Sequence, residues 1–192
     1  MPSSDCVMLA AGGSKRTEKW KMTLPFGEST VVRRSVENAL QGCGRVILVT
    51  GYRAGELEAL FSGNERVITV RNPGWQRGMF SSIKTGAEAV ETRRFFIALG
   101  DMPLVGPPVY ETLLEYEHSD IVIPKFEGKK GHPVLLSSRV LKSIRREPDS
   151  STLRDILALF PTLAVPVKDP GILEDIDTDR DYHKLKEDTR AD

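Results

Sequence analysis

The chain has 192 residues, with 27 Lys plus Arg and 27 Asp plus Glu, so its net charge is zero. Any anion-binding site must therefore be local, because the overall charge does not favour binding of nucleic acid or of an anionic membrane. Its length predicts a single domain over residues 1–192, and its two cysteines are too few for a disulfide framework or a zinc cluster. Its apolar runs are far shorter than the ~20 residues that span a membrane, and its N-terminus lacks the pattern of a signal peptide, so a cytoplasmic location is expected.

The first predicted element is a buried strand at residues 7–10, which leads into a loop of small residues at 11–14. Four basic side chains follow this loop: Lys15, Arg16, Lys19 and Lys21. Small residues let backbone N–H groups approach a ligand closely, and clustered cations suit several phosphates at once. The stretch therefore predicts a cradle for a triphosphate, with an exposed basic turn as the alternative.

Two better-known phosphate loops do not fit this stretch. The Walker pattern needs Lys-Ser or Lys-Thr directly after its last glycine, which is absent here. The dinucleotide fingerprint needs three spaced glycines and an acid near the end of the second strand. Here the two glycines are adjacent and the second strand ends at Thr50, so neither pattern is present.

Apolar runs predict four further strands, and apolar residues at helical spacing predict helices between them. The strands lie at residues 46–49, 67–70, 95–99 and 121–123. Continuous rather than alternating apolar strands indicate a sheet that is covered on both faces and is therefore mostly parallel. The alternation predicts a layered α/β domain, with its ligand at the carboxyl ends of the strands.

The last third of the chain departs from this alternation. A polar stretch at 126–130 and the segment 131–133 precede a strand at 134–136, which predicts a short hairpin or a protruding flap. Two helices follow, and then an edge strand at 163–167, where a proline is tolerated. A cluster of acids comes before a terminal helix through Lys186.

Polar residues follow several predicted strands at ends that are expected to meet. Thr50, Asn72 and Asp101 each stand at the carboxyl end of a strand, as the cradle does. Mg²⁺ prefers one or two carboxylates beside phosphate oxygens and waters, and Asp101 is the best candidate ligand, with a helix cap or turn acid as the alternative. Asp177 is a second candidate because Ile176 can anchor its segment. The alternative is an exposed acidic turn that caps the last helix.

Three further side chains are candidates for substrate contacts. Lys21 is placed to contact phosphates where charge develops during transfer. Ser82 lies near a helix N-terminus with Ser81 and is a candidate for base or ribose, although capping alone would explain one of the two. His132 stands between a glycine and a proline and is read as a substrate contact rather than a general base.

Five motifs in one order resemble those of the MobA-like nucleotidyltransferases. They are LAAGGSKR with Lys21, the segment 72–82, Gly100-Asp101-Met102-Pro103, Gly131-His132-Pro133 and the acidic segment 175–179. The resemblance extends from Val7 to about Leu185. It is strongest to the subgroup of CTP:molybdenum cofactor cytidylyltransferases, through Trp20-Lys21-Met22 and the VTGYR run at 49–53.

The resemblance implies a Rossmann-like nucleotidyltransferase fold with Mg²⁺ held by Asp101 and Asp177. It also implies transfer of CMP from CTP to the terminal phosphate of molybdenum-bound molybdopterin, with release of pyrophosphate. The product would be the cytosine dinucleotide form of the cofactor, destined for a molybdenum hydroxylase of the xanthine dehydrogenase type.

By the same resemblance, Lys21, Arg16 and Asp101 are catalytic and His132 faces the acceptor. The residues expected to bind the nucleotide are Leu9, Ala10, Ala11, Gly12, Gly13, Ser14, Arg16, Lys21, Thr50, Asn72, Gly78, Ser82 and Asp101. Two segments depart from the family pattern. Thr17-Glu18 stands where many relatives have Met-Gly, and residues 148–152 stand where many have Gly-Asp-x-Gly.

Two alternatives stay open at this point. One is a nucleotidyltransferase that uses GTP, or one that acts on a sugar phosphate or alcohol phosphate. The other is a non-catalytic protein that delivers the molybdenum cofactor. The set of Lys21, Asp101 and Asp177 argues against the delivery protein, because binding without turnover does not need all three.

Overall fold

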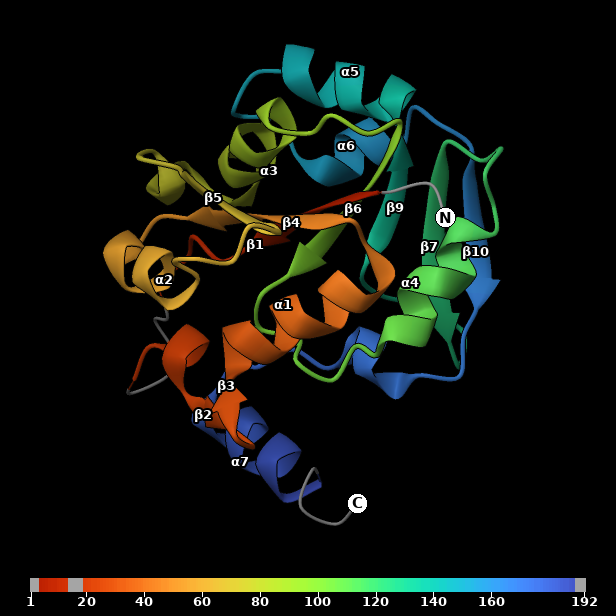
Figure 1. Cartoon of the computed structure of the whole chain (residues 1–192). Helices are drawn as coiled ribbons and strands as arrows, with labels where there is room; N and C mark the ends of the chain where they lie inside the picture. Colours follow the sequence, from red (N-terminus) through yellow and green to blue (C-terminus); the bar gives the residue numbers. More distant parts are fainter. Residues whose placement is uncertain (1–3, 14–18, 189–192) are drawn as a thin grey trace.

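The computed structural model describes residues 4–13 and 19–188, which form an α/β fold built on one large sheet (Figure 1). In spatial order its strands are β10 (Thr162–Pro166), β7 (Ile121–Phe126), β9 (Val134–Ser137), β6 (Arg94–Leu99), β1 (Asp5–Leu9), β4 (Arg45–Thr50) and β5 (Val67–Arg71), and β8 (Lys129–Lys130) pairs with β7. Among the described strands of this sheet, β8 and β9 run antiparallel to their neighbours and the others pair in parallel. The mostly parallel sheet that the sequence predicts is confirmed.

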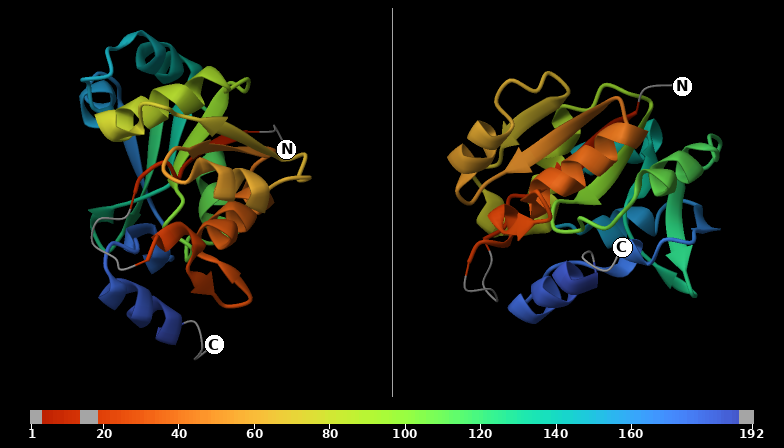
Figure 2. Two further views of the ribbon diagram at one scale, coloured as in Figure 1. Left: turned by 90° about the vertical axis from the view of Figure 1, so that its left-hand side faces the viewer. Right: turned by 60° about the horizontal axis from the view of Figure 1, so that its bottom comes forward.

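Helices cover both faces of the sheet, as the two rotated views also show (Figure 2). One face carries α1 (Val31–Gly42), α2 (Ala54–Leu60) and α4 (Pro107–Leu114), and the other carries α3 (Met79–Glu88), α5 (Ser138–Arg146) and α6 (Leu153–Leu157). Along β1, Met8 packs into the first layer and Val7 into the second. Each central strand therefore buries successive apolar residues on opposite faces, which explains the continuous apolar runs.

The strand predicted at 134–136 does not belong to a protruding flap. β9 lies between β6 and β7, antiparallel to both, and Leu135 and Leu136 are fully buried. The predicted hairpin lies just before it, where Glu127 and Gly128 turn β7 into β8 with positive φ angles. The short hairpin expected in this part of the chain is therefore confirmed. The place of β9 between β6 and β7 was not predicted, because a short apolar run does not specify which strands will lie beside it.

The remaining elements are η1 (Lys21–Thr23), β2 (Pro25–Phe26), β3 (Ser29–Thr30), η2 (Trp75–Arg77), η3 (Pro170–Leu173) and the terminal helix α7 (Asp179–Asp188). The last two return the chain to the carboxyl edge of the sheet. After η3, the N–H of Ile176 donates to the Asp101 carbonyl oxygen at 3.1 Å, and the Ile176 side chain is fully buried. Tyr182 and Leu185 of α7 then share an apolar cluster with Phe26, so α7 lies beside the β2–β3 hairpin (Figure 2).

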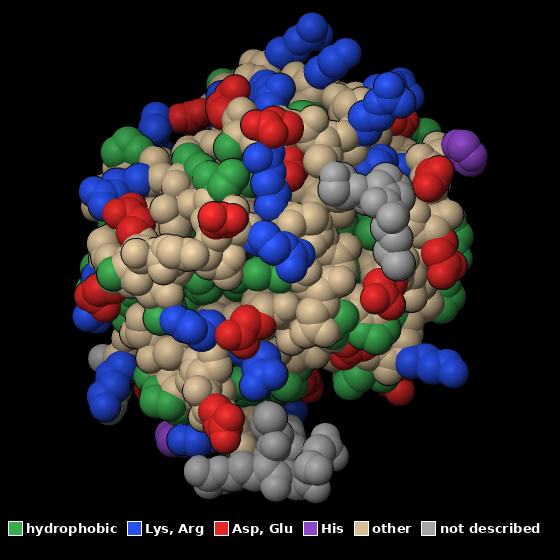
Figure 3. Space-filling view, viewed as in Figure 1, with side chains coloured by type: hydrophobic (Ala, Val, Ile, Leu, Met, Phe, Trp, Pro, Cys, Tyr) green, Lys and Arg blue, Asp and Glu red, His purple; other side chains and the backbone are tan. Residues whose placement is uncertain are grey.

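Basic and acidic side chains are interspersed over much of the face shown in Figure 3, in keeping with the zero net charge. None of the helices in the described part of the chain is both long and apolar enough to span a bilayer.

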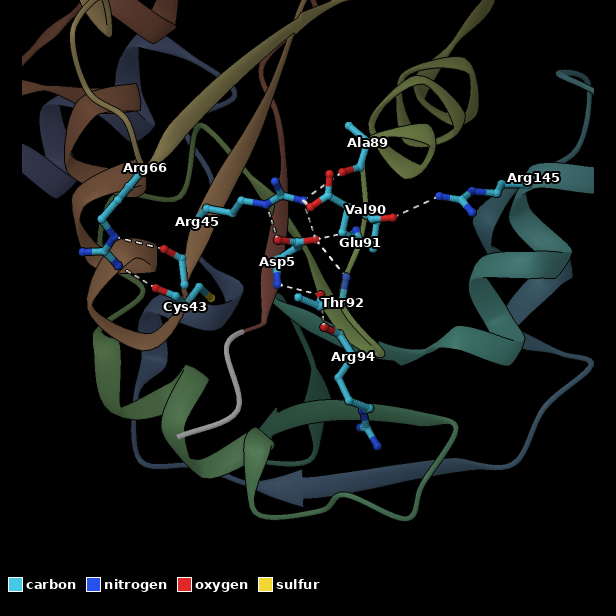
Figure 4. Close-up of polar contacts among 11 residues, drawn as sticks. Asp5, Cys43, Arg45, Arg66, Ala89, Val90, Glu91, Thr92, Arg94 and Arg145 are labelled. Carbon is cyan, nitrogen blue, oxygen red and sulfur yellow. Dashed lines mark hydrogen bonds and ion pairs between the residues drawn. The ribbon is translucent and has the colours of Figure 1, made fainter.

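Asp5 begins the central strand β1 with a buried carboxylate that ties three segments together (Figure 4). It accepts hydrogen bonds from Arg45 Nε at 2.6 Å and from the N–H groups of Glu91 and Thr92 at 2.8 and 3.2 Å. Burial acts to raise the pKa of Asp5, but these donors outweigh it and leave the pKa lowered. The carboxylate therefore stabilises the sheet at the amino-terminal end of β1.

We expect Asp5→Asn to lower the free energy of unfolding by about 2 kcal/mol at pH 7, because the charged hydrogen bonds to Arg45 and the backbone are lost. Stability from a lowered pKa is present above the ordinary value of 3.8 and is lost as the pH falls through the folded-state pKa. The difference between wild type and variant should therefore shrink below pH 3.8. Urea unfolding over a pH series measures it.

Glu91→Gln is the matched control, because the exposed Glu91 carboxylate pairs with the same guanidinium at 3.0 Å. This variant should change the free energy of unfolding by less than about 0.5 kcal/mol. Equal losses in the two variants, or a loss in Asp5→Asn that does not depend on pH, would contradict the role given to Asp5.

Candidate active site

A cavity of about 700 Å³ opens at the carboxyl ends of β1 and β6, with Leu9 and Leu99 in its wall. After β1, the chain first adds β4 and β5 on one side of that strand and later adds β6 on its other side, which gives the strand order β5-β4-β1-β6. Open α/β sheets bind ligands at such a reversal of strand order. Loops that are far apart in the sequence therefore meet around one hollow.

Three carboxylates gather at one side of this cavity. Asp101 follows β6, and Asp175 and Asp177 flank the buried Ile176 on the returning segment. Oxygens of the three carboxylates lie within 4.8 Å of one another. Converging carboxylate oxygens are the ligands that a hard divalent cation such as Mg²⁺ prefers, so the donor set fits such an ion.

Asp175 is the acid that sequence reasoning left out of the metal site. The sequence indicates that Ile176 can anchor the segment and turn its neighbours outward, and the structure confirms that arrangement. In an extended segment, residues two apart lie on the same side, so the prediction for Asp177 applied equally to Asp175. That alternation was the available signal.

Asp177 does not cap the terminal helix. Thr178 and Asp181 form the reciprocal contact of a helix start instead, because the Asp181 N–H donates to Thr178 Oγ1 at 3.2 Å and the Thr178 N–H donates to Asp181 Oδ2 at 2.8 Å. The carboxylate of Asp177 faces the cavity and Lys21. The capping alternative is therefore wrong for this residue.

Lys21 reaches the carboxylates from the opposite side of the cavity. Its Nζ lies 2.5 Å from Asp101 Oδ2 and 3.2 Å from Asp177 Oδ1. The Lys21 and Asp101 side chains are 15% and 13% exposed, so this contact is shielded from solvent more than a surface ion pair is. The ammonium and a divalent cation would compete for the same oxygens.

The protonation states of these groups follow from their mutual charges. Burial acts to lower the pKa of Lys21, but the carboxylates of Asp101 and Asp177 outweigh it and leave the pKa raised, so the ammonium is charged at pH 7. Partial desolvation, together with the negative charges of Asp177 and Asp101, raises the pKa of Asp175. The proximity of the carboxylates thus makes ionisation of Asp175 less favourable.

The small-residue loop after β1 is held in place by hydrogen bonds from neighbouring strand ends. Gly100 N–H donates to the Leu9 carbonyl at 2.9 Å, and Tyr52 N–H donates to the Ala11 carbonyl at 2.9 Å. Gly51 is needed at this point, because a Cβ there would lie 2.7 Å from the Ala11 oxygen. Ala11 and the two glycines after it line the cavity.

Two residues predicted for this loop, Ser14 and Arg16, lie outside the described residues. Of the others, Leu9, Lys21 and Asp101 are in the cavity wall, whereas Ala10 is buried in the sheet and is not among the lining residues.

Thr50 and Asn72, which were also predicted to bind the nucleotide, lie behind the cavity wall rather than in it. Both are essentially fully buried. The Thr50 hydroxyl donates to Glu58 Oε1 at 3.3 Å. Asn72 Nδ2 donates to Ser81 Oγ and Ser82 Oγ at 2.9 and 3.0 Å, so Asn72 braces the start of α3.

Gly78 and Ser82 line the cavity on the α3 side, beside Trp75, Gln76 and Met79. Gly78 precedes the first turn of α3 with φ of 108°, a backbone conformation that L side chains rarely adopt. Ser81 Oγ is buried and donates to the Gly78 carbonyl at 2.8 Å, so this serine stabilises the turn. It does not cap α3, because a capping oxygen accepts a hydrogen bond from a backbone N–H, and none of the described N–H groups does so here.

His132 is half-buried and does not lie on a protruding flap. Its N–H donates to the Ile172 carbonyl at 3.1 Å, and its Nδ1 is buried without a hydrogen-bond partner in the described part of the chain. Burial lowers the pKa of His132, so the imidazole is neutral at pH 7. Its contact with an acceptor stays a prediction.

The chain is similar to known proteins along most of its length. The sequence model of the MobA-like NTP transferase domain matches residues 6–165. The molybdenum cofactor cytidylyltransferase of Escherichia coli (strain K12) is 34% identical over 187 residues, which cover 97% of this chain and 97% of that relative.

Solved structures show the same fold. A nucleotidyl transferase from Methanothermobacter thermautotroptrophicus superposes with a TM-score of 0.86 at 24% identity, over 99% of both chains. Molybdopterin-guanine dinucleotide biosynthesis protein A from Archaeoglobus fulgidus superposes with a TM-score of 0.74 at 18% identity, over 98% of this chain and 100% of that one. At these identities the two structures support the fold alone.

The competition between the Lys21 ammonium and a divalent cation for the carboxylate oxygens can be tested by metal binding alone, without an activity assay. In the absence of nucleotide, Lys21→Met should bind Mn²⁺ about tenfold more tightly than wild type, because the ammonium no longer neutralises Asp101 and Asp177. Titration followed by electron paramagnetic resonance measures the free Mn²⁺. Lys19→Met is the matched control, since Lys19 is exposed two residues away. Unchanged Mn²⁺ affinity in Lys21→Met would contradict the competition.

Proposed function

The chain belongs to the family of MobA-like NTP transferase domains, and from that premise we propose that it transfers CMP from CTP to the terminal phosphate of molybdenum-bound molybdopterin. The products are molybdopterin cytosine dinucleotide and pyrophosphate. The choice of CTP and of this acceptor is supported by the name of the Escherichia coli relative, which is similar along nearly the whole chain. The observation that carries the proposal is the meeting of Lys21 with Asp101 and Asp177 in a cavity beside a glycine loop.

In the proposed reaction, an oxygen of the acceptor phosphate attacks the α-phosphorus of CTP. The bond between the α-phosphorus and the bridging oxygen breaks, and pyrophosphate leaves with that oxygen. The loop of Ala11, Gly12 and Gly13 binds the triphosphate through its backbone, and Lys21 moves from the carboxylates to the phosphate oxygens as negative charge builds there. Positioning and charge stabilisation supply most of what such a transfer requires.

Asp101, Asp175 and Asp177 would hold the divalent cation, for which we propose Mg²⁺. When bound, such an ion neutralises phosphate charge and polarises the α-phosphate. The residues around the cavity do the rest, because Trp75, Met79 and Ser82 form the wall where the nucleoside would lie.

We assign the acceptor to the side of the cavity nearest His132, whose neutral imidazole can accept or donate a hydrogen bond. We propose that the reaction takes place in the cytoplasm and that its product is delivered to a molybdenum hydroxylase of the xanthine dehydrogenase type. Residues 1–192 would act as one domain.

The direct test is pyrophosphate release with each of the four NTPs and Mg²⁺, in the presence and absence of molybdenum-loaded molybdopterin. The proposal expects release with CTP that depends on the acceptor. Release with GTP alone would contradict the cytidylyl assignment. Release from no NTP by a folded protein would contradict the enzyme assignment and support a delivery role.

Asp101→Asn should keep the fold and lower kcat by ~100-fold or more, because it removes a carboxylate from the centre of charge stabilisation. Glu174→Gln is the control. Glu174 is a neighbour of Asp175 in the chain, but it does not line the cavity and its carboxylate is paired 3.7 Å from Lys184. Thermal unfolding and the rate of pyrophosphate release should separate the two variants, and near-normal turnover by Asp101→Asn would rule out its role.

A further inference from the structure

Three aromatic rings from separate parts of the chain meet beside the cavity, and one of them, Trp75, lines it. They are Trp20 before η1, Tyr52 after β4 and Trp75 in η2, and the first and last are the two tryptophans of the chain. The ring centroids of Trp20 and Tyr52 lie 5.7 Å apart at an interplanar angle of 81°, and those of Tyr52 and Trp75 lie 5.8 Å apart at 65°. Both contacts are edge-to-face, which is a favourable arrangement for aromatic pairs. Tyr52 is thus the middle member of the cluster.

The cluster is built against the glycine loop. A Cβ added to Gly13 would lie 3.3 Å from Tyr52 Cγ and 3.5 Å from Trp75 Cη2, so the backbone of Gly13 lies directly against both rings. Trp20 Nε1 donates to the Gly12 carbonyl at 3.2 Å, and the Tyr52 N–H donates to the Ala11 carbonyl at 2.9 Å. Ala11, Gly12 and Gly13 are therefore each contacted by at least one member of the cluster.

The residue that follows Tyr52 has a strained backbone. Arg53, the next residue, has φ of 50° and ψ of 36°, a left-handed conformation that is costly for a residue with a side chain. Its guanidinium carbon lies 5.4 Å from the centroid of the Trp20 ring, so the strained residue also contacts the cluster. Strain of this kind persists where the surrounding structure determines it, and it gathers at functional sites.

Exposure sets Tyr52 apart from an ordinary core aromatic. The residue remains 40% exposed, and its hydroxyl makes no hydrogen bond to another described residue. The ring of Tyr52, and not its hydroxyl, contacts the loop. An exposed aromatic ring seated on a phosphate-binding loop is hard to explain by folding alone.

We propose that Tyr52 is a positioning residue, whose ring, seated on Gly13 and held between Trp20 and Trp75, keeps the backbone N–H groups of the loop in the orientation that receives the triphosphate. This inference rests on the proposed function and deepens it, because it gives triphosphate recognition a supporting residue, Tyr52, that does not itself line the cavity. The ligand class is the triphosphate chain rather than the base.

The test compares wild type with Tyr52→Leu and Tyr52→Phe. Because both tryptophans contact Tyr52, their fluorescence reports ligand binding in each protein. In Tyr52→Leu, the Kd for CTP and the inhibition constant of inorganic tripolyphosphate should rise about tenfold, whereas the inhibition constant of cytidine should not change. Tyr52→Phe keeps the ring and should remain within twofold of wild type for all three ligands.

Kinetics add a second readout. In Tyr52→Leu the KM for CTP should rise about tenfold with kcat within threefold, and the thermal unfolding midpoint should stay close to that of wild type. If Tyr52→Leu does not fold, Tyr52→Met replaces it with the same expectations.

Unchanged tripolyphosphate binding in Tyr52→Leu would overturn the inference, and so would an equal loss of cytidine binding, which would assign the ring to the base. These outcomes are distinct from failure of the proposed function. That failure would appear as wild-type protein that neither binds CTP nor releases pyrophosphate from it, and in that case the role of Tyr52 is rejected with it.

Discussion

The hydrogen bond from the Ile176 N–H to the Asp101 carbonyl is the contact on which the site depends. It seats Ile176 in the apolar cluster beneath α7, so that Asp175 and Asp177 turn toward Asp101 from a segment more than seventy residues further along the chain. The concentrated negative charge is then neutralised in part by Lys21 from the other side of the cavity. A segment that folds back late in the chain thus completes a site begun by β1 and β6.

The sheet makes this arrangement precise because its strands leave little freedom at their ends. β1 is paired in register with β4 and β6 along its whole length, and Asp5 fixes its start through Arg45 (Figure 4). The loop after β1 therefore emerges at a fixed place and direction, and the aromatic cluster of Trp20, Tyr52 and Trp75 supports it from outside. Rigid supports that leave backbone N–H groups exposed lower the cost of ordering a flexible triphosphate.

The sequence predicted the parts of this protein that depend on short-range patterns. Asp101 could be recognised because it stands just beyond a continuous apolar strand, whose end must face the ligand side, and Lys21 because it belongs to the basic stretch that follows the small-residue loop. Thr50 and Asn72 follow strands too, but their side chains bond to Glu58 and to Ser81 behind the wall, and strand-end position alone does not give side-chain direction. The position of β9 depends on contacts between distant segments, which periodicity does not encode. Asp175 was missed although its spacing from Asp177 places both acids on the same side of Ile176.

The central claim is that the carboxylates, Lys21 and the glycine loop form one centre for a metal–CTP complex. The most direct measurement is a crystal structure with Mn²⁺ and a non-hydrolysable CTP analogue, in which anomalous scattering locates the metal. The account predicts Mn²⁺ bound between Asp101 and Asp177, the triphosphate along Ala11 to Gly13, and Lys21 Nζ moved onto a phosphate oxygen. Mn²⁺ bound elsewhere, or a triphosphate that does not touch this loop, would contradict it.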